Sequence, residues 1–233
     1  MNTQHEMRDM GFRSKRYKAE SEQSGKEPMG LAEAVEKVKS FKVKFDQSIE
    51  CVLNLGIDPK QADQLVRGSI SLPHGIGKQK KVVAFCEDSD VEAARKAGAV
   101  EAGCDELVKK VSDGWMDFDV AIASPKVMSK VGKLGRVLGP QGKMPSPKNG
   151  TVTADVATAV AEFAAGKVEF RNDAGGNVHV VVGKQSFEAE KLIGNIEAFV
   201  SHIKNIKPPA AKGAYIKKMC VSATMSPSIM VSI

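Results

Sequence analysis

The hydrophobic pattern of this chain changes its period twice, and this change limits the folds that the chain can adopt. In the middle of the chain, short apolar segments alternate with segments of helical spacing. The expected strands are residues 82–86 and 118–123, and the expected helices are residues 91–97, 105–111 and a stretch that starts at Pro125. Strands that alternate with helices need crossover connections. The middle part is therefore predicted to form a mostly parallel sheet with helices on both faces.

The flanking segments have different patterns. Residues 49–55 alternate apolar and polar side chains, which predicts a strand with one buried face. Residues 168–171 and 178–182 flank a turn-rich connection, so we expect them to pair as an antiparallel hairpin. The other elements expected here are helices from Leu31 and over 188–204, and strands over 215–221 and 228–233.

These patterns predict a fold of mixed α+β and α/β class with two domains. A split, two-ended α+β domain is expected from residues 1–75 and 167–233, and a Rossmann-like α/β domain, residues 76–166, is expected as an insertion between them. A chain of 233 residues with 42% hydrophobic content is long enough to bury two modest cores. Because the chain crosses between the domains twice, near Pro73 and Gly166, this crossing is expected to act as a hinge.

Charge is distributed unevenly between these two parts. The net charge of +6 and the isoelectric point near 9.0 favour an anionic partner. Residues 76–166 hold 13 Lys/Arg against 12 Asp/Glu, whereas the flanks hold 21 against 16. The last 36 residues contain no acid, and their lysines are Lys204, Lys207, Lys212, Lys217 and Lys218. A basic face is therefore expected on the two-ended part.

The stretch 132–150 is the most unusual segment in composition. It holds five glycines, three prolines and four Lys/Arg in nineteen residues, with no Asp or Glu. This composition predicts an ordered, cationic loop whose backbone can approach a phosphate-rich partner closely. It does not fit a phosphate-binding P-loop, because Val137 and Met144 stand where the first glycine and the hydroxyl residue are needed. The alternative interpretation is that this stretch is an ordinary flexible connector.

The sequence contains no pattern that favours catalysis, a metal or a cofactor. Cys51, Cys86, Cys104 and Cys220 are scattered and lack zinc-ligand spacing, so they are expected to be small core residues in a reducing compartment. No membrane span and no export signal are expected, which favours a cytoplasmic protein.

A basic cluster, Arg13 to Lys18, stands out near the N-terminus. It has two interpretations that the sequence leaves equally open. One is a frayed terminus, and the other is an arm that contacts phosphate.

The stretch GRVLGPQGKMPSPKNGTVT, residues 135–153, resembles the signature segment of the L-one family of large-subunit ribosomal proteins. Further matching segments in the right order are residues 44–46, 55–59, 66–68, 72–75, 113–119, 170–173 and Thr224-Met225. The resemblance runs from Lys15 to near the C-terminus. It implies the same split two-domain arrangement and no enzymatic activity.

The resemblance also implies a set of partners. The family binds a mobile stalk of large-subunit ribosomal RNA near the transfer RNA exit site, which implies contact with transfer RNA there and help in releasing deacylated transfer RNA. It also implies repression of translation of the protein's own operon messenger RNA. We therefore expect a monomer off the ribosome, with no membrane partner and no cofactor.

The resemblance places an RNA-binding face on the two-ended domain. The matching positions are Lys44, Phe45, Ser48, Glu50, Arg171, Asp173, Lys184, Ser186, Ser222, Thr224 and Met225. Lysines suit phosphates, hydroxyls suit the 2′-OH, and apolar atoms suit ribose or base faces. Glu50 would repel phosphate unless it accepts from a 2′-OH or a base amine, and it would then discriminate RNA from DNA. Without the resemblance, Phe45 and Met225 are better explained as packing residues, and Ser222 and Thr224 as turn caps.

The chain departs from the family pattern at three positions. Gln141 replaces a basic residue, Ala174 replaces a lysine, and Ser226 replaces the glycine after Thr-Met. If position 226 needs a positive φ, its serine is strained, and we expect Ser226→Gly to relieve about 1 kcal/mol. If the turn has rearranged, glycine is instead expected to destabilise it slightly.

One alternative function comes from a different class. A Rossmann-like domain is compatible with an enzyme that binds a nucleotide or a sugar phosphate. Against this alternative, the sequence offers no nucleophile–base pair, no metal cluster and no intact phosphate fingerprint.

Overall fold

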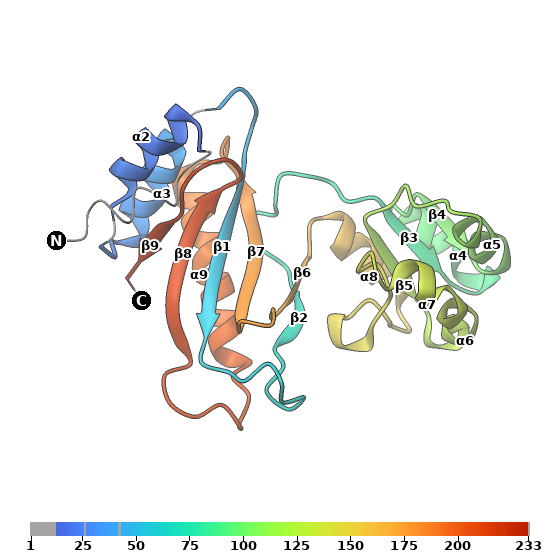
Figure 1. Cartoon of the computed structure of the whole chain (residues 1–233). Coiled ribbons are helices and arrows are strands. Elements are labelled where there is room, and N and C mark those ends of the chain that lie inside the picture. The colour runs from blue at the N-terminus through green and yellow to red at the C-terminus, as the bar shows by residue number, and fades with distance from the viewer. Residues whose placement is uncertain (1–12, 26, 42, 233) are drawn as a thin grey trace.

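The computed structural model describes residues 13–25, 27–41 and 43–232, and the strands of this part form three separate sheets (Figure 1). The largest sheet is antiparallel, with strand order β7-β1-β8-β9. Its strands are β1 (Ser48–Leu55), β7 (Asn177–Lys184), β8 (Ile216–Ala223) and β9 (Ile229–Val231). Expected residues 1–12 of the two-ended part, and Ile233 of its last strand, lie outside the described residues. The central strand β1 therefore pairs on both sides with strands from the C-terminal third of the chain.

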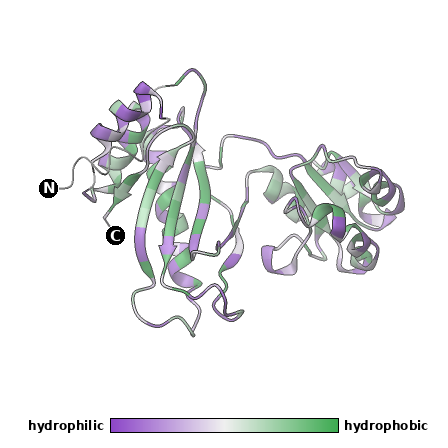
Figure 2. Ribbon diagram, in the orientation of Figure 1, coloured by the Kyte–Doolittle hydropathy of each residue, from purple (hydrophilic) through white to green (hydrophobic). Residues whose placement is uncertain are grey.

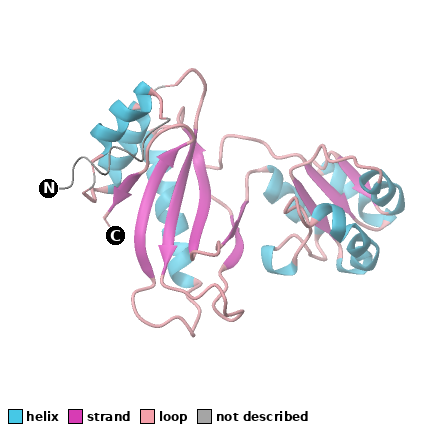
Figure 3. Ribbon diagram, in the orientation of Figure 1, coloured by secondary structure: helices cyan, strands magenta, loops and turns pink. Residues whose placement is uncertain are grey.

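One face of this sheet is covered and the other is open. Along β1, buried and half-buried residues alternate, with Ile49, Cys51 and Leu53 pointing into the core. This is the alternation expected of a strand with one solvated face. The helices α3 (Leu31–Ser40) and α9 (Ala189–Asn205) pack on the buried side, as Figure 3 shows, and α2 (Lys15–Ser24) lies beside α3.

The core beneath this sheet draws on both ends of the chain. It contains buried residues from the segments 34–76 and 168–231 and none from the stretch between them, within the residues that the structure describes. Phe170 and Phe199 meet edge to face in it, with ring centroids 6.0 Å apart. Two separate hydrophobic clusters, drawn from residues 82–163, lie on the two faces of another sheet.

That other sheet is parallel and has the strand order β4-β3-β5. Its strands are β3 (Val82–Phe85), β4 (Glu101–Gly103) and β5 (Val120–Ala123). Helices α4 (Asp88–Lys96) and α8 (Val156–Ala164) pack on one face; α5 (Asp105–Ser112), α6 (Met128–Val131) and α7 (Gly135–Leu138) accompany the other face. Every residue of β3 and β5 is buried, as expected of strands covered on both sides, and Figure 2 shows the hydrophobic residues concentrated on these strands.

The third sheet pairs β2 (Arg67–Ile70) with β6 (Val168–Arg171), and it corrects the expected hairpin. Residues 168–171 pair with β2, whereas 178–182 belong to β7 and pair with β1. The predicted hairpin is therefore reduced to its turn and to one antiparallel bridge between Asn172 and Val178. The physical reason lies in Asn172, which is buried. Its backbone N–H donates to the Val66 carbonyl at 2.9 Å, and its side-chain oxygen accepts from the Val66 N–H at 3.0 Å. These two hydrogen bonds attach the end of β6 to the residue that precedes β2.

The glycine-rich stretch 132–150 is less of a loop than its composition predicts. It contains the helical turns η2 (Gly132–Leu134), α7 and η3 (Pro147–Asn149), which follow η1 (Pro125–Val127) and α6. Gly142 and Gly150 adopt φ values of 69° and 70°, where other residues would be strained. The turn η3 packs against β2, and the Asn149 side chain donates to Glu169 Oε2 at 3.0 Å. The stretch therefore joins the parallel sheet to the β2–β6 pair.

A buried asparagine fixes the point where the chain leaves the first core. Asn195 of α9 has no exposed surface. Its side-chain oxygen accepts from the His74 N–H at 3.0 Å, and its amide donates to the carbonyls of Gly75 at 2.9 Å and Val182 at 2.7 Å. One side chain thus ties the segment after β2 to the helix and to β7.

We expect Asn195→Ala to lower the free energy of unfolding by about 2 to 4 kcal/mol, because three buried backbone groups lose their partner. The measurement is chemical denaturation followed by circular dichroism. Asn205→Ala is the matched control, since Asn205 is exposed at the end of the same helix. Equal stabilities for the two variants would contradict this role of Asn195.

Candidate nucleic-acid interface

The open face of the four-stranded sheet brings together the polar positions of three strands. The half-buried residues of β1 are Ser48, Glu50, Val52 and Asn54. Glu50 lies opposite Ser222 of β8 and Val181 of β7, and Ser48 lies opposite Lys184. Because directly paired residues share a face, these side chains form one continuous surface, which we call the open face.

Nine of the eleven expected site residues gather where β1 begins and β7 and β8 end. They are Lys44, Phe45, Ser48, Glu50, Lys184, Ser186, Ser222, Thr224 and Met225. We call this group the β1-start cluster. It is composed of residues from three strand ends and the two loops next to them, so the resemblance placed residues together that are up to 181 positions apart in sequence.

Hydrogen bonds hold the centre of this cluster. Lys184 Nζ donates to Ser48 Oγ at 2.9 Å. Thr224 Oγ1 accepts from the Ser48 N–H at 3.1 Å and donates to the Ser48 carbonyl at 3.2 Å. The Thr224 hydroxyl is therefore already engaged with the backbone, and it acts first as a structural clamp between β1 and the β8–β9 turn.

The loop before β1 is fastened by carboxylate and amide groups. The Asp46 carboxylate accepts from the Ser186 N–H at 3.0 Å and from its hydroxyl at 2.9 Å. Gln47 is fully buried; its oxygen accepts from the Met225 N–H at 2.9 Å, and its amide donates to the Phe41 carbonyl at 3.0 Å. Gln47 thus joins the loop before β1 to the β8–β9 turn.

Two large apolar side chains remain uncovered on this fastened framework. Phe45 is 52% exposed and Met225 is 53% exposed. Neither packs in a core, so the interpretation of both as packing residues is wrong. Lys44 is exposed beside Phe45. An aromatic ring, a thioether and a cation presented together on rigid backbone are suited to stack on a base or ribose and to bind a phosphate.

Asp173 lies at the opposite end of the four-stranded sheet, and Arg171 lies in the separate β2–β6 sheet, opposite Arg67. Arg171 ends β6, and Asp173 sits in the turn that leads into β7. The Asp173 carboxylate accepts from the Asn177 side chain at 3.0 Å and from the backbone N–H groups of Asn177 and Gly175 at 2.7 and 2.8 Å. These bonds, the Asn177 side chain first, lower the pKa of Asp173. Asp173 therefore stays a carboxylate and holds the turn.

The open face connects these two groups over about 20 Å, the length of six strand residues. The connecting residues are Val52, Asn54, Asn177, His179, Lys218 and Cys220. His179 Nε2 lies 3.7 Å from Asp173 Oδ2, and Asn54 donates to Asn177 at 2.7 Å. The resemblance does not include these residues, although the alternating pattern of β1 marks Val52 and Asn54 as outward-facing.

The four cysteines divide between core and surface. Cys51 and Cys86 are buried, whereas Cys104 and Cys220 are half-buried, and all four are free thiols. Burial raises the pKa of the Cys51 thiol to about 12. The expectation of core cysteines is therefore correct for two of them.

The backbone at Ser226 corrects the strain prediction. Among the described residues, no residue other than glycine has a positive φ. The Ser226 N–H donates to the Ala223 carbonyl at 3.1 Å, and its hydroxyl lies 3.4 Å from Gln47 Oε1. Serine is thus unstrained there, and the turn does not need a glycine.

We accordingly expect Ser226→Gly to lower the free energy of unfolding by roughly 0.5 to 1 kcal/mol, since glycine loses more backbone freedom on folding and the hydroxyl contact is lost. Thermal unfolding measures the change. Ser228→Gly in the same connection is the control for backbone freedom, because Ser228 is exposed. A Ser226→Gly protein more stable than the parent would restore the strain hypothesis.

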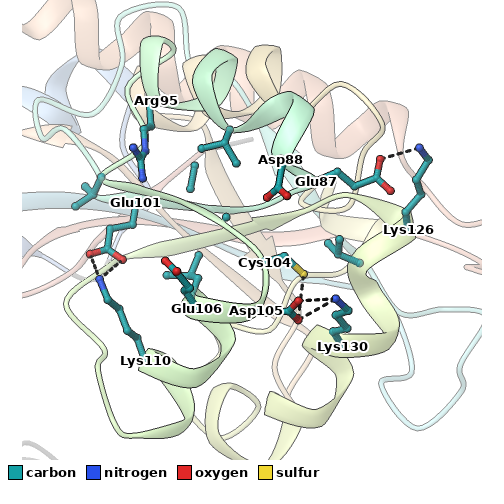
Figure 4. A pocket seen from close by; sticks show the side chains of 16 residues that line it. Glu87, Asp88, Arg95, Glu101, Cys104, Asp105, Glu106, Lys110, Lys126 and Lys130 are labelled. Atoms are coloured by element: carbon teal, nitrogen blue, oxygen red, sulfur yellow. Dashed lines mark hydrogen bonds and ion pairs between the residues drawn. The ribbon is translucent and has the colours of Figure 1, made fainter.

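A cavity of about 780 Å³ lies at the carboxyl ends of β3, β4 and β5, where α/β proteins often bind ligands (Figure 4). Its walls carry the ion pairs Glu87–Lys126, Glu101–Lys110 and Asp105–Lys130, each at 2.8 Å. Asp88 and Glu106 add two more carboxylates. The walls thus carry five carboxylates and four cations, and three of the cations are already paired with carboxylates. Such a cavity is not suited to bind a phosphate. Across the described residues, no group of His, Cys, Asp and Glu is placed to hold a metal ion.

Within the part of the chain that the structure describes, no helix combines the length and the hydrophobicity needed to cross a bilayer.

Known proteins resemble this chain over most of its length. A family model described as the ribosomal protein L1p/L10e family matches residues 25–227. A large ribosomal subunit protein uL1 from Rhodopirellula baltica is 55% identical over 224 residues, covering 96% of this chain and 100% of the relative. Proteins of the same name from a Nocardioides species and from Chlorobaculum tepidum are each 49% identical, covering 94% and 86% of this chain and 92% and 87% of the relatives. The matched range contains the whole β1-start cluster and begins after α2.

Proposed function

The chain belongs to the ribosomal protein L1p/L10e family, and we propose that it binds large-subunit ribosomal RNA through the β1-start cluster and the open face. The family consists of structural ribosomal proteins and not of enzymes. This protein is therefore an RNA-binding component of the large ribosomal subunit that performs no chemistry. The alternative of an enzyme that binds a nucleotide or a sugar phosphate is not supported, because the cavity of the parallel sheet is lined by carboxylates.

The observation that carries the RNA assignment is the exposure of Phe45 and Met225 on a fully hydrogen-bonded framework. A single exposed apolar residue, such as Val100, needs no explanation, but two large apolar side chains next to hydrogen-bonded strand ends that also carry lysines are suited to a partner. Lys184 and Lys44 supply cations beside it, and Ser186 and Ser222 supply hydroxyls. This combination fits single-stranded or irregular RNA, whose bases are free to stack and whose 2′-OH groups are accessible.

The architecture that supports this function is a two-domain one. We propose that residues 1–75 and 167–233 form a split α+β domain and that residues 76–166 form an inserted Rossmann-like domain. Separate hydrophobic clusters and separate sheets support this division. Ile76 packs with the first cluster, so the crossing lies immediately after it.

The finer assignments follow from the family. We propose that the RNA target is the mobile ribosomal RNA stalk near the transfer RNA exit site, and that the protein assists the release of deacylated transfer RNA there. We further propose that it represses translation of its own operon messenger RNA, that it is a monomer off the ribosome, and that it acts in the cytoplasm. Sedimentation of a cell extract tests the ribosomal assignment: the protein should travel with large subunits, and a protein found only in the light fractions would contradict it.

We expect Phe45→Ala to weaken binding to the organism's own large-subunit ribosomal RNA by about 1 to 3 kcal/mol, the usual value of one stacked base. Its effect on unfolding should stay within about 0.5 kcal/mol, because the ring is exposed. Val100→Ala, at a position 53% exposed in the inserted part, is the control and should change neither quantity. Affinity unchanged by Phe45→Ala would remove Phe45 from the interface.

Glu50 offers a test of sugar recognition. It lies on the open face opposite Ser222, and its carboxylate can accept from a 2′-OH. We expect Glu50→Gln to lower the ratio of RNA affinity to DNA affinity, measured with an RNA and a DNA of the same sequence. Affinity for DNA should rise, because a negative charge facing phosphate has gone. An unchanged ratio would show that Glu50 does not read the sugar.

A further inference from the structure

We propose that α2 is a second phosphate-binding element of this protein, which continues the RNA interface beyond the sheet and is docked onto it by Arg16. This inference rests on the proposed RNA-binding function and adds to it α2, which precedes the residues 25–227 that the family model matches, although the resemblance itself begins at Lys15. Figure 1 shows α2 beside α3, at the end of the molecule where β1 begins and β7 and β8 end.

The docking contact comes from one side chain. Arg16 donates from Nη1 to both Glu20 oxygens at 2.8 Å and from Nη2 to the Met225 carbonyl at 2.8 Å. Glu20 is 8% exposed, so this pair is held at the junction of helix and turn. A guanidinium fixed by a carboxylate is preorganised for its remaining donor. The helix is thereby attached to the residue that carries the exposed thioether of the β1-start cluster.

The helix is ordered, which excludes a frayed terminus for residues 15–24. Ser14 caps it, because its hydroxyl oxygen accepts from the Tyr17 N–H at 3.2 Å. The Arg13 guanidinium lies over the Tyr17 ring at 4.7 Å from the centroid. The basic cluster is therefore presented on a helical turn with defined geometry.

The placement of the charges points to an anion. Lys15 and Lys18 are exposed and, three residues apart, lie on one side of the helix. They occupy the first turn, where the helix dipole makes a cation unfavourable, and no acidic residue accompanies them there. A charge arrangement that costs helix stability but strengthens the positive potential at this end is suited to binding phosphate.

Continuity with the β1-start cluster selects RNA as the occupant. The Met225 carbonyl that receives Arg16 belongs to the turn that presents Thr224 and the Met225 thioether. An RNA strand stacked on that cluster must place its next phosphates beyond the edge of the sheet, where α2 supplies cations. An acidic protein or an anionic membrane is the competing occupant, and the following experiment decides between them.

The test compares two double variants of the full chain that lose the same charge. In the first, Lys15→Gln and Lys18→Gln remove the cations of α2. In the second, Lys96→Gln and Lys109→Gln remove two exposed lysines of the inserted part. Affinity for the organism's own large-subunit ribosomal RNA is measured between 0.05 and 0.3 M salt, about the range in which counterion release is resolved.

We expect the α2 variant to bind about tenfold more weakly near 0.15 M salt, with a log–log salt slope smaller by roughly 1.4 to 1.8, the value for two phosphate contacts. The control variant should change affinity less than about twofold and leave the slope unaltered. Equal losses in the two variants, or no loss in either, would overturn the proposal, and would leave a protein or membrane partner as the use of the patch.

Arg16→Gln provides a second, independent measurement. If Arg16 positions α2, the lysine substitutions should matter less in the Arg16→Gln background than in the parent, so the two effects are not additive. A merely structural helix would give additive losses and an unchanged salt slope, which would overturn the proposal.

The two proposals fail in different ways. Absence of saturable binding by the parent protein would overturn the proposed function itself. Binding by the parent that Phe45→Ala weakens and the α2 variant does not would overturn only the assignment of α2.

Discussion

The pairing of β1 with β7 on one side and β8 on the other is the constraint on which the rest of the structure depends. Both partners lie more than a hundred residues after β1, so the sheet can form only when the two ends of the chain meet. The intervening chain must therefore leave and return at neighbouring points. Gly75 and Gly166 make this possible: both have positive φ, and a Cβ at Gly166 would lie 3.3 Å from Ile76. The close approach of the two crossing segments is thus a consequence of the strand order.

The same pairing explains why the candidate interface is rigid. Lys184 and Thr224 each bond to Ser48 because β1 starts where its two neighbours end. Buried Gln47 then links the loop before β1 to the turn after β8. A surface whose polar groups are already placed loses little conformational entropy when a partner binds. In this way the long-range strand order, and not any local motif, produces the preorganisation of the site.

Much of this fold could be predicted from hydrophobic spacing, and the exceptions have identifiable causes. The alternation of β1 and the helical spacing of α9 reflect burial against one core, so the sequence records them directly. The pairing of β6 with β2 depends instead on the buried side chain of Asn172, and strand spacing contains no information about such a bond. The helix α8 and the strand β4 were not predicted. Only Thr158 and Glu162 are polar on the exposed side of α8, and β4 is only three residues long.

The site was predictable to a similar extent. The family resemblance named nine residues that the structure brings together in the β1-start cluster, because β1 pairs with both β7 and β8. The resemblance did not include Gln47 and Arg16, which both form hydrogen bonds with the distant Met225. It also led to a prediction of backbone strain at Ser226, which the turn does not have. Polar residues that act through tertiary hydrogen bonds are thus the ones that sequence reasoning misses.

The junction between the parallel sheet and the β2–β6 pair is polar, in contrast to the two cores that it separates. Lys80 donates to the Lys167 carbonyl at 2.9 Å, and Asn149 donates to Glu169 at 3.0 Å. Burial raises the pKa of Glu169, and burial lowers the pKa of Lys80, so each charge is partly desolvated without a strong compensating partner. Contacts of this kind contribute little net stability, because the cost of desolvation offsets the attraction. The four-stranded sheet and the parallel sheet each have hydrophobic clusters of their own, so we expect any relative motion of these two parts to occur at this polar junction.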